Sequence, residues 1–117
     1  MFSVIIPLYN KAPYIYKAVW SVLTQTYPEF ELIIIDDGST DNGINQINNI
    51  QDNRLTIVTQ KNTGVSTARN NGVKLAKYDY LCFLDADDWW NQYFLEEMKK
   101  LIFTSDNDLV IKEYETK

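Results

Sequence analysis

Histidine is absent from this chain of 117 residues, and basic residues are outnumbered by acidic ones. Histidine titrates closest to neutral pH and is the commonest metal ligand in proteins, so acid–base or metal chemistry must rest on carboxylates. The 16 Asp and Glu against 11 Lys and Arg give a formal net charge of -5. A chain with this charge has no basic field to hold nucleic acid, which we exclude as a partner.

The chain has one cysteine, Cys82, and lacks any apolar run of the roughly 18 residues that cross a bilayer. A disulfide within the chain is therefore excluded, and the apolar neighbours of Cys82 indicate a small buried residue rather than a reactive thiol. The N-terminus also lacks the basic residues and cleavage site of a secretory signal. We expect a cytoplasmic location, with peripheral association at the inner membrane face through regions outside the sequence as an alternative.

Hydrophobic residues make up 45% of the sequence and aromatic residues 14%. This is enough apolar material for one compact core, whereas the length is too small for two ordinary domains. No internal repeat or linker-like segment is present. We therefore expect residues 1–117 to form a single domain.

Short apolar runs alternate along the chain with segments whose apolar residues recur every three or four positions. The runs predict strands buried in a sheet, and the periodic segments predict amphipathic helices. The predicted strands are residues 3–6, 31–35, 55–58, 80–84 and 109–111. The predicted helices run from Pro13 to before Thr26, over 44–50, from Ser66 or a neighbour to Ala76, and over 94–103. The predicted order is βαβαβαβαβ.

Strands that alternate with helices favour a mostly parallel sheet, because a parallel connection needs a crossover long enough for a helix. We therefore predict an α/β fold with helices on both faces of the sheet. The helix residues predicted to face it are Ile15, Val19, Val22, Leu23, Ala68, Gly72, Val73, Ala76, Leu95, Met98, Leu101 and Ile102. Ligands of such sheets bind beyond the carboxyl ends of the strands, where polar residues 9–10, 36–37, 62–64 and 85–88 are predicted to lie.

Asp85 and Asp87 directly follow the fourth predicted strand. Residues two apart in an extended segment point to the same side, so the two carboxylates can face one ion. Mg²⁺ and Mn²⁺ prefer oxygen ligands and leave positions for water and a substrate phosphate. The alternative is that Asp87 or Asp88 caps a helix that begins there. We favour the metal site because carboxylates crowded at a strand end repel one another unless a cation is present.

Three further residues at this edge each have two interpretations. After the second strand, Gly38 and residues 39–40 suit a turn or helix cap, whereas the Asp37 carboxylate can also accept from a base N–H or a ribose hydroxyl. Tyr9 is either a core aromatic or a ring that stacks on a nucleobase. Arg69 is either a solvated helix residue or a donor to a phosphate or a uracil oxygen.

Four segments of the chain, taken in order, resemble the family 2 glycosyltransferases, whose GT-A fold has a Rossmann-like nucleotide-binding half and a DxD metal motif. The segments are residues 3–10, 31–41, 62–72 and 83–88. Any one of them is a weak signal. Four in the same order, each at a predicted strand end or helix start, are highly specific.

The resemblance implies an inverting hexosyltransferase that moves a sugar from a nucleotide diphosphate to an acceptor hydroxyl. The donor it implies is a UDP-sugar, and the acceptor is a sugar or a lipid-linked glycan. Asp85 is then expected beside the ribose and the metal, and Asp87 is expected to ligate Mn²⁺ or Mg²⁺.

The resemblance also implies how the nucleotide is held. The resemblance implies that Pro7 and Tyr9 border the nucleobase and that the Asp37 carboxylate accepts a hydrogen bond from the uracil ring. Arg69 is carried over as a further substrate-binding residue.

In that family, the catalytic base and the residues that contact the acceptor usually come after the part of the protein that this chain resembles. The resemblance therefore implies that residues 1–117 belong to a longer transferase, with the base beyond Lys117, and that they bind donor without efficient turnover. A non-catalytic nucleotide-sugar-binding module and a nucleotidyltransferase stay open as alternatives. A receiver-like signalling domain is disfavoured because no acidic pair follows the first strand, and a nicotinamide-binding domain because no G-x-G-x-x-G motif occurs.

Overall fold

A computed structural model describes residues 1–104. In this part of the chain four strands form one sheet: β1 (Phe2–Leu8), β2 (Phe30–Asp36), β3 (Leu55–Thr59) and β4 (Tyr80–Phe83). The helices are α1 (Ala12–Leu23), the short 3₁₀ helix η1 (Ile44–Gln46), α2 (Val65–Leu75) and α3 (Phe94–Thr104). The strand order is β3-β2-β1-β4, and every neighbouring pair is parallel.

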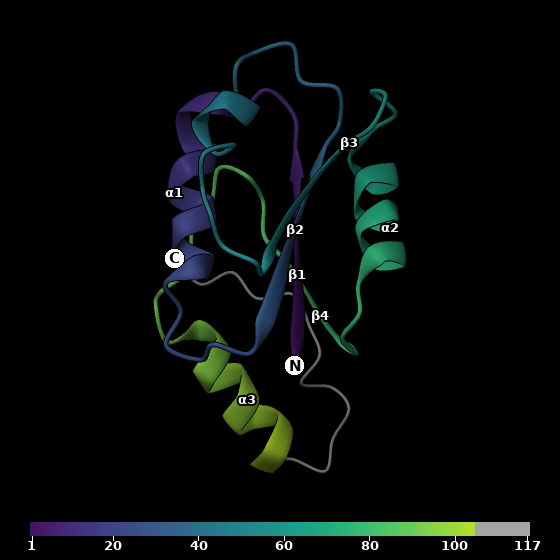
Figure 1. Cartoon of the computed structure of the whole chain (residues 1–117). Helices are drawn as coiled ribbons and strands as arrows, with labels where there is room; N and C mark the ends of the chain where they lie inside the picture. Colours follow the sequence, from purple (N-terminus) through teal and green to yellow (C-terminus); the bar gives the residue numbers. More distant parts are fainter. Residues whose placement is uncertain (105–117) are drawn as a thin grey trace.

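Helices cover both faces of this sheet, so β1 and β2 are buried along their whole length. Figure 1 shows α1 and α3 on one side of the sheet and α2 on the other. On the first face Val4 and Ile6 join a large core cluster, and on the second face Ile5 and Ile33 pack with Ala68 of α2. The predicted α/β fold is confirmed, and burial on both faces explains why these strands are continuously apolar.

Most of the predicted inward residues are buried. The four predicted for α1 are buried, as are Ala68, Gly72, Leu95 and Met98. Val73 and Leu101 contradict the prediction, because they expose 38% and 39% of their surface at the outer edge of the apolar stripe of their helices. Cys82 packs against the larger cluster, and burial raises the pKa of its thiol to about 12, in line with an unreactive core residue.

The predicted helix over residues 44–50 is wrong, since only η1 forms there. Three asparagines lie in this segment and Gly43 directly precedes it, and both residue types favour turns over helix interiors. Ile47 still reaches the core and is fully buried. The last predicted strand, residues 109–111, lies outside the described residues. None of the helices within residues 1–104 is long and apolar enough to span a membrane.

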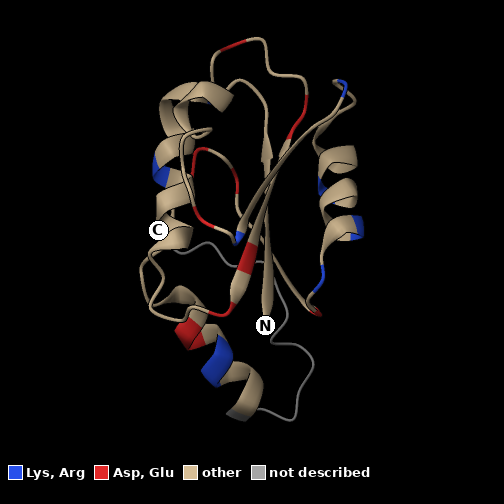
Figure 2. Cartoon of the chain, in the orientation of Figure 1, with Lys and Arg blue, Asp and Glu red and all other residues tan. Residues whose placement is uncertain are grey.

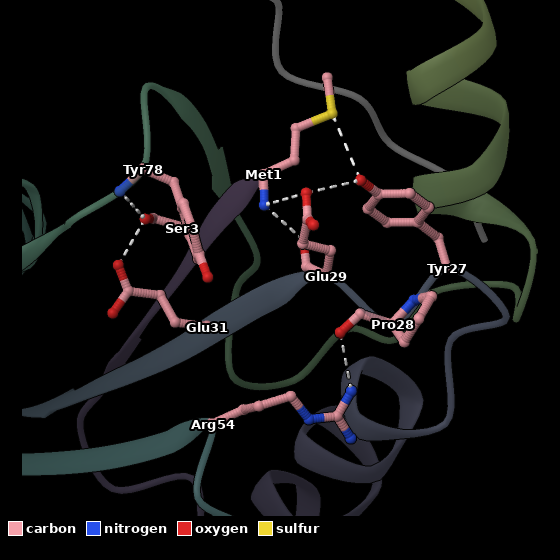
Figure 3. Close-up of polar contacts among 8 residues, drawn as sticks. All are labelled: Met1, Ser3, Tyr27, Pro28, Glu29, Glu31, Arg54 and Tyr78. Carbon is pink, nitrogen blue, oxygen red and sulfur yellow. Dashed lines mark hydrogen bonds and ion pairs between the residues drawn. The ribbon is translucent and has the colours of Figure 1, made fainter.

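A buried polar network closes the amino-terminal end of the sheet (Figure 3). The Ser3 hydroxyl donates to Glu31 Oε2 (2.6 Å) and accepts from the backbone N–H of Tyr78 (3.1 Å). The same Glu31 oxygen accepts from the Lys77 N–H (2.7 Å). Both side chains are at most 9% exposed. This network joins β1 and β2 to the turn before β4 through groups that satisfy one another.

Helix α2 lies unusually close to β1 at Gly72. A Cβ added to Gly72 would come within 2.5 Å of Ile5 Cγ2, a distance that real Cβ atoms essentially never show. Glycine therefore sets the spacing of α2 from the sheet, and α2 positions the residues at its own N-terminal end.

We expect Gly72→Ala to lower the free energy of unfolding by about 1–3 kcal/mol, the usual cost of overpacking a core. The clash with Ile5 outweighs the roughly 1 kcal/mol that alanine gains over glycine in a helix. Urea unfolding followed by far-UV circular dichroism measures the change. Asn70→Ala, at an exposed position of the same helix, is the control and should leave stability unchanged or raise it. An equal rise in both variants would contradict the close packing.

Candidate nucleotide-sugar and metal site

The loops that follow the strands meet at the carboxyl end of the sheet. The Asp37 N–H donates to the Leu8 carbonyl (2.8 Å), and the Gln60 N–H donates to the Asp36 carbonyl (2.8 Å). These bonds continue the parallel ladder into the loops after β1, β2 and β3. The predicted gathering of polar segments on one edge is confirmed. Figure 2 shows acidic residues in the loops that follow β2 and β4.

Asn10 ties the loop after β1 to the loop after β2. Its side-chain oxygen accepts from the backbone N–H groups of Thr40 (2.8 Å) and Asp41 (3.2 Å), and its own N–H donates to Ser39 Oγ (3.0 Å). Asn10 has a φ of 50°, a left-handed conformation that asparagine adopts more readily than most residues. The tie fixes the direction in which the chain leaves β1 and therefore the position of Tyr9.

Asp41 caps α1 from a distant part of the chain. Its Oδ2 accepts from the Ala12 N–H (3.0 Å) and its Oδ1 from the Gly43 N–H (3.0 Å). The capping role predicted for residues 39–40 ahead of the next helix is wrong, since η1 has no side-chain cap. These residues bond to the loop after β1 instead. The predicted turn at Gly38 is confirmed by its φ of 70°.

The Asp37 carboxylate is buried, with the residue only 3% exposed, and holds the loop before α2. Its Oδ1 accepts from Gln60 Nε2 (2.8 Å) and the Thr63 N–H (2.9 Å), and its Oδ2 from the Gly64 N–H (3.0 Å). Burial opposes ionisation, but these hydrogen bonds outweigh it and lower the pKa of Asp37 below its usual value. A carboxylate has about four acceptor positions, so Oδ2 keeps capacity for one further donor.

Pro7 and Tyr9 differ sharply in exposure. Pro7 is buried within β1, with its Cα paired to that of Ile35. Tyr9 follows the strand and exposes 45% of its surface. Of these two predicted neighbours of the nucleobase, Tyr9 offers the ring that a planar ligand can reach.

The structure brings Arg69 and Asp85 together. Arg69 Nη2 donates to Asp85 Oδ1 (3.2 Å), and the two side chains are 36% and 56% exposed. Arg69 Nε is buried and has no hydrogen-bond partner among the described residues. Arg69 therefore faces the carboxyl end of the sheet, which agrees with its interpretation as a donor to a ligand oxygen. Its Nε–H group is the donor that such an oxygen could use.

A turn gathers the carboxylates after β4. Ligand oxygens of Asp85, Asp87 and Asp88 all lie within 4.8 Å of one another. The backbone N–H of Asp88 donates to the Asp85 carbonyl (3.0 Å), and Ala86 and Asp87 have turn geometry. The predicted clustering is confirmed for Asp85 and Asp87, but its cause is different. A turn, unlike an extended segment, also brings in Asp88, which the prediction had considered only as a helix cap.

The alternative role of Asp87 or Asp88 as a helix cap is not what the structure shows. Helix α3 begins only at Phe94, and Asn91 Oδ1 accepts from the Tyr93 N–H (2.8 Å) just before it. Neither aspartate therefore caps α3.

Lys11 is a residue of this site that the sequence did not indicate. Its Nζ lies 3.6 Å from Asp87 Oδ2, and the side chains are 43% and 45% exposed. Nothing in the spacing of the sequence links residue 11 to residue 87, because the contact depends on β1 and β4 being neighbours in the sheet.

The donor set of this acidic turn suits a hard divalent cation. Three carboxylates supply only oxygen ligands, which Mg²⁺ and Mn²⁺ prefer. Two of them are exposed, so water and a ligand phosphate can complete a coordination sphere. Lys11 and Arg69 flank the turn and provide positive charge for an anion at the same place.

A family model for glycosyl transferase family 2 matches residues 3–115, nearly the whole chain. The chain belongs to glycosyltransferase family 2.

Three known glycosyltransferases illustrate the similarity. The chain is 40% identical over 121 residues to UDP-Glc:alpha-D-GlcNAc-diphosphoundecaprenol beta-1,3-glucosyltransferase WfaP of Escherichia coli, covering 96% of this chain and 47% of WfaP. S. aureus TarS 1-349 in complex with UDP-GlcNAc matches with a TM-score of 0.82 and 32% identity, covering 88% of this chain and 31% of that structure. Mannosyltransferase PcManGT from Pyrobaculum calidifontis, in complex with GDP-Man and Mn2+, matches with a TM-score of 0.78 and 28% identity, covering 85% and 31%.

The chain is shorter than these family members. It spans between 16% and 47% of the length of four curated relatives. The region that the family model matches, residues 3–115, contains all four of the segments that carry the resemblance in sequence.

We expect Asp37→Asn to lower the free energy of unfolding at neutral pH by about 1–3 kcal/mol, the cost of losing partners for buried polar groups. The new amide N–H₂ would face the backbone N–H groups that the carboxylate now accepts from. The pKa of Asp37 is lowered in the folded protein, so its stabilisation is complete above the unfolded value of about 3.9 and is lost as the pH falls through the folded-state pKa.

Urea unfolding at pH 7 and at successively lower pH measures this difference. The gap between wild type and Asp37→Asn should narrow in acid. Asp79→Asn, at an exposed position, is the matched control and should show no gap at pH 7. A gap that widened in acid would contradict the role given to the Asp37 carboxylate.

Proposed function

We propose that this chain binds the nucleotide-sugar donor of an inverting hexosyltransferase, and that the donor is a UDP-sugar held through Mn²⁺ or Mg²⁺. The observation that carries the proposal is the three-carboxylate turn flanked by two cationic side chains at the carboxyl end of the sheet. The same edge carries an exposed tyrosine and a buried carboxylate with one free acceptor position.

The acidic turn is the proposed metal site. Asp87 is assigned as ligand, Asp85 as a ligand that also lies by the ribose, and Asp88 adds a third oxygen donor. A divalent cation bound there would neutralise the diphosphate that departs from the sugar. The Mn²⁺ in the PcManGT complex supports a divalent ion without deciding between the two metals.

The nucleoside is proposed to lie between Tyr9 and Arg69. The exposed ring of Tyr9 suits stacking on a base, and the last acceptor position of Asp37 suits the imide N–H of uracil. Arg69 Nε, which has no hydrogen-bond partner within residues 1–104, suits a uracil or phosphate oxygen. UDP-GlcNAc in TarS and UDP-Glc in the name of WfaP favour uridine as the nucleoside.

The acceptor is proposed to be a sugar or a lipid-linked glycan, in line with the diphosphoundecaprenol-linked sugar that WfaP uses. Inverting transfer needs a base to deprotonate the acceptor hydroxyl. We propose that residues outside 1–117 supply it. Asp41 is unsuited, because its carboxylate holds the start of α1 through the Ala12 N–H and the following loop through the Gly43 N–H. A cytoplasmic location, with the acceptor lipid at the inner membrane face, belongs to the same proposal.

UDP with Mn²⁺ or Mg²⁺ should stabilise the protein by about 2.7 kcal/mol at a free ligand concentration one hundred times the Kd. A ligand that binds only the folded state shifts the folding equilibrium by mass action. Thermal melts with UDP and metal, with metal alone and with UDP alone measure the shift. A folded sample that shows no shift with saturating nucleotide and metal would overturn the donor site.

The nucleotide and metal contributions should separate by substitution. Asp87→Asn should leave the weak metal-free binding of UDP intact and abolish the increase that metal gives, since Asp87 acts through the cation. Asp37→Asn should weaken UDP with or without metal. Isothermal titration calorimetry, at a temperature where both variants are folded, distinguishes the two. Equal losses from both substitutions in metal-free buffer would contradict the assignment.

A further inference from the structure

We propose that Lys11 couples the two ligands of this site, so that a divalent cation binds well only together with the donor diphosphate. The inference rests on the proposed function, because it concerns the same metal and the same nucleotide. Lys11 belongs neither to the sequence segments that carry the resemblance to the family nor to the acidic turn, so this role is additional to theirs.

The backbone of Lys11 is held from both sides. Before it, Asn10 is fixed by its bonds to Thr40 and Asp41. After it, the Ala12 N–H is capped by Asp41, and the Lys11 carbonyl accepts from residues 14 and 15 in the first turn of α1. The side chain therefore starts from a fixed point and reaches Asp87, where its Nζ lies 3.6 Å from Oδ2.

This ion pair adds little to the stability of the fold. Both side chains are more than two-fifths exposed, and pairs of this kind are screened by solvent. The position of the lysine is also unfavourable by itself, since it lies at the N-terminus of α1, the positive end of the helix dipole. A lysine placed there is better explained by an anion that it meets in the ligand-bound protein.

Counting charges around the turn shows what Lys11 does to a metal. Lys11 pairs with Asp87 and Arg69 pairs with Asp85, so these two cations and the three clustered carboxylates sum to one negative charge. A divalent cation alone would reverse this sum to one positive charge. The two negative charges of a nucleotide-sugar diphosphate would restore it. Without Lys11, the cation alone would give neutrality and lose much of its dependence on the diphosphate.

The chemistry of lysine suits such an exchange. Its ammonium group is a compact charge on a flexible four-carbon stem, and it binds phosphate as a point charge. When a cation occupies the Asp87 carboxylate, the ammonium is repelled from it and is within reach of the phosphates that join the metal. The two binding events thereby favour each other, and by linkage each ligand strengthens the other by the same factor.

The test is calorimetric titration of Mn²⁺ into the full chain with and without saturating UDP. Lys11→Met removes the charge and keeps the length of the side chain. It should bind Mn²⁺ alone about three- to tenfold more tightly than wild type, the effect of one screened charge a few Å away. The factor by which UDP strengthens Mn²⁺ binding should fall by about tenfold, within the usual range of coupling between sites.

Two further variants separate charge from structure. Lys17→Met removes a lysine of the same helix that lies over the Trp89 ring, 4.7 Å from its centroid, and should keep the wild-type coupling. Lys11→Arg keeps the charge and should retain most of the coupling. The difference between wild type and Lys11→Met should also shrink at high salt.

If wild type binds both ligands but Lys11→Met shows unchanged coupling, or weaker binding of Mn²⁺ alone, the role of Lys11 is wrong while the proposed function stands. If wild type binds neither UDP nor Mn²⁺, both proposals fall.

Discussion

Parallel pairing of β1 with both of its neighbours is the constraint on which the rest of this structure depends. Because β2 and β4 run in the same direction as β1, their carboxyl ends and the loops that follow lie at one edge. Residues separated by about 75 positions in the chain, such as Lys11 and Asp87, thereby become neighbours. An antiparallel β4 would place the acidic turn at the opposite end of the sheet.

The aspartates at this edge divide into two groups with different surroundings. Asp37 and Asp41 direct their carboxylates at backbone N–H groups and hold the loops in place. Asp85 and Asp87 direct theirs toward solvent and toward cationic side chains. The first group therefore holds the loops of this edge in place, and the second group gives the edge a negative charge that a bound cation can neutralise. Asp37 belongs to both in our proposal, because its carboxylate retains one acceptor position.

The sequence predicted the fold well where periodicity and burial agree. Strands β1 to β4 follow from short apolar runs, and helices α1, α2 and α3 follow from apolar residues spaced three or four positions apart. The helix predicted over 44–50 is wrong although its apolar spacing suits a helix, because its asparagines and the preceding Gly43 favour turns. The convergence of the polar segments was predictable from parallel topology. The inclusion of Asp88, the cap from Asp41 and the Lys11 contact were not, since each depends on loop geometry that no periodicity encodes.

The cap that Asp41 provides to α1 also constrains how the length of this chain can vary. One side chain holds the first turn of a helix that begins 29 residues earlier, and Asp41 lies only five residues after the end of β2. An insertion between Asp36 and Asp41 would detach the helix start and release the loop that carries Tyr9. Between η1 and β3 the chain is tied instead to the other end of α1, where Arg54 Nη2 donates to the Leu23 carbonyl (3.3 Å). Insertions and deletions are therefore better tolerated after η1, where they leave the ligand edge unchanged.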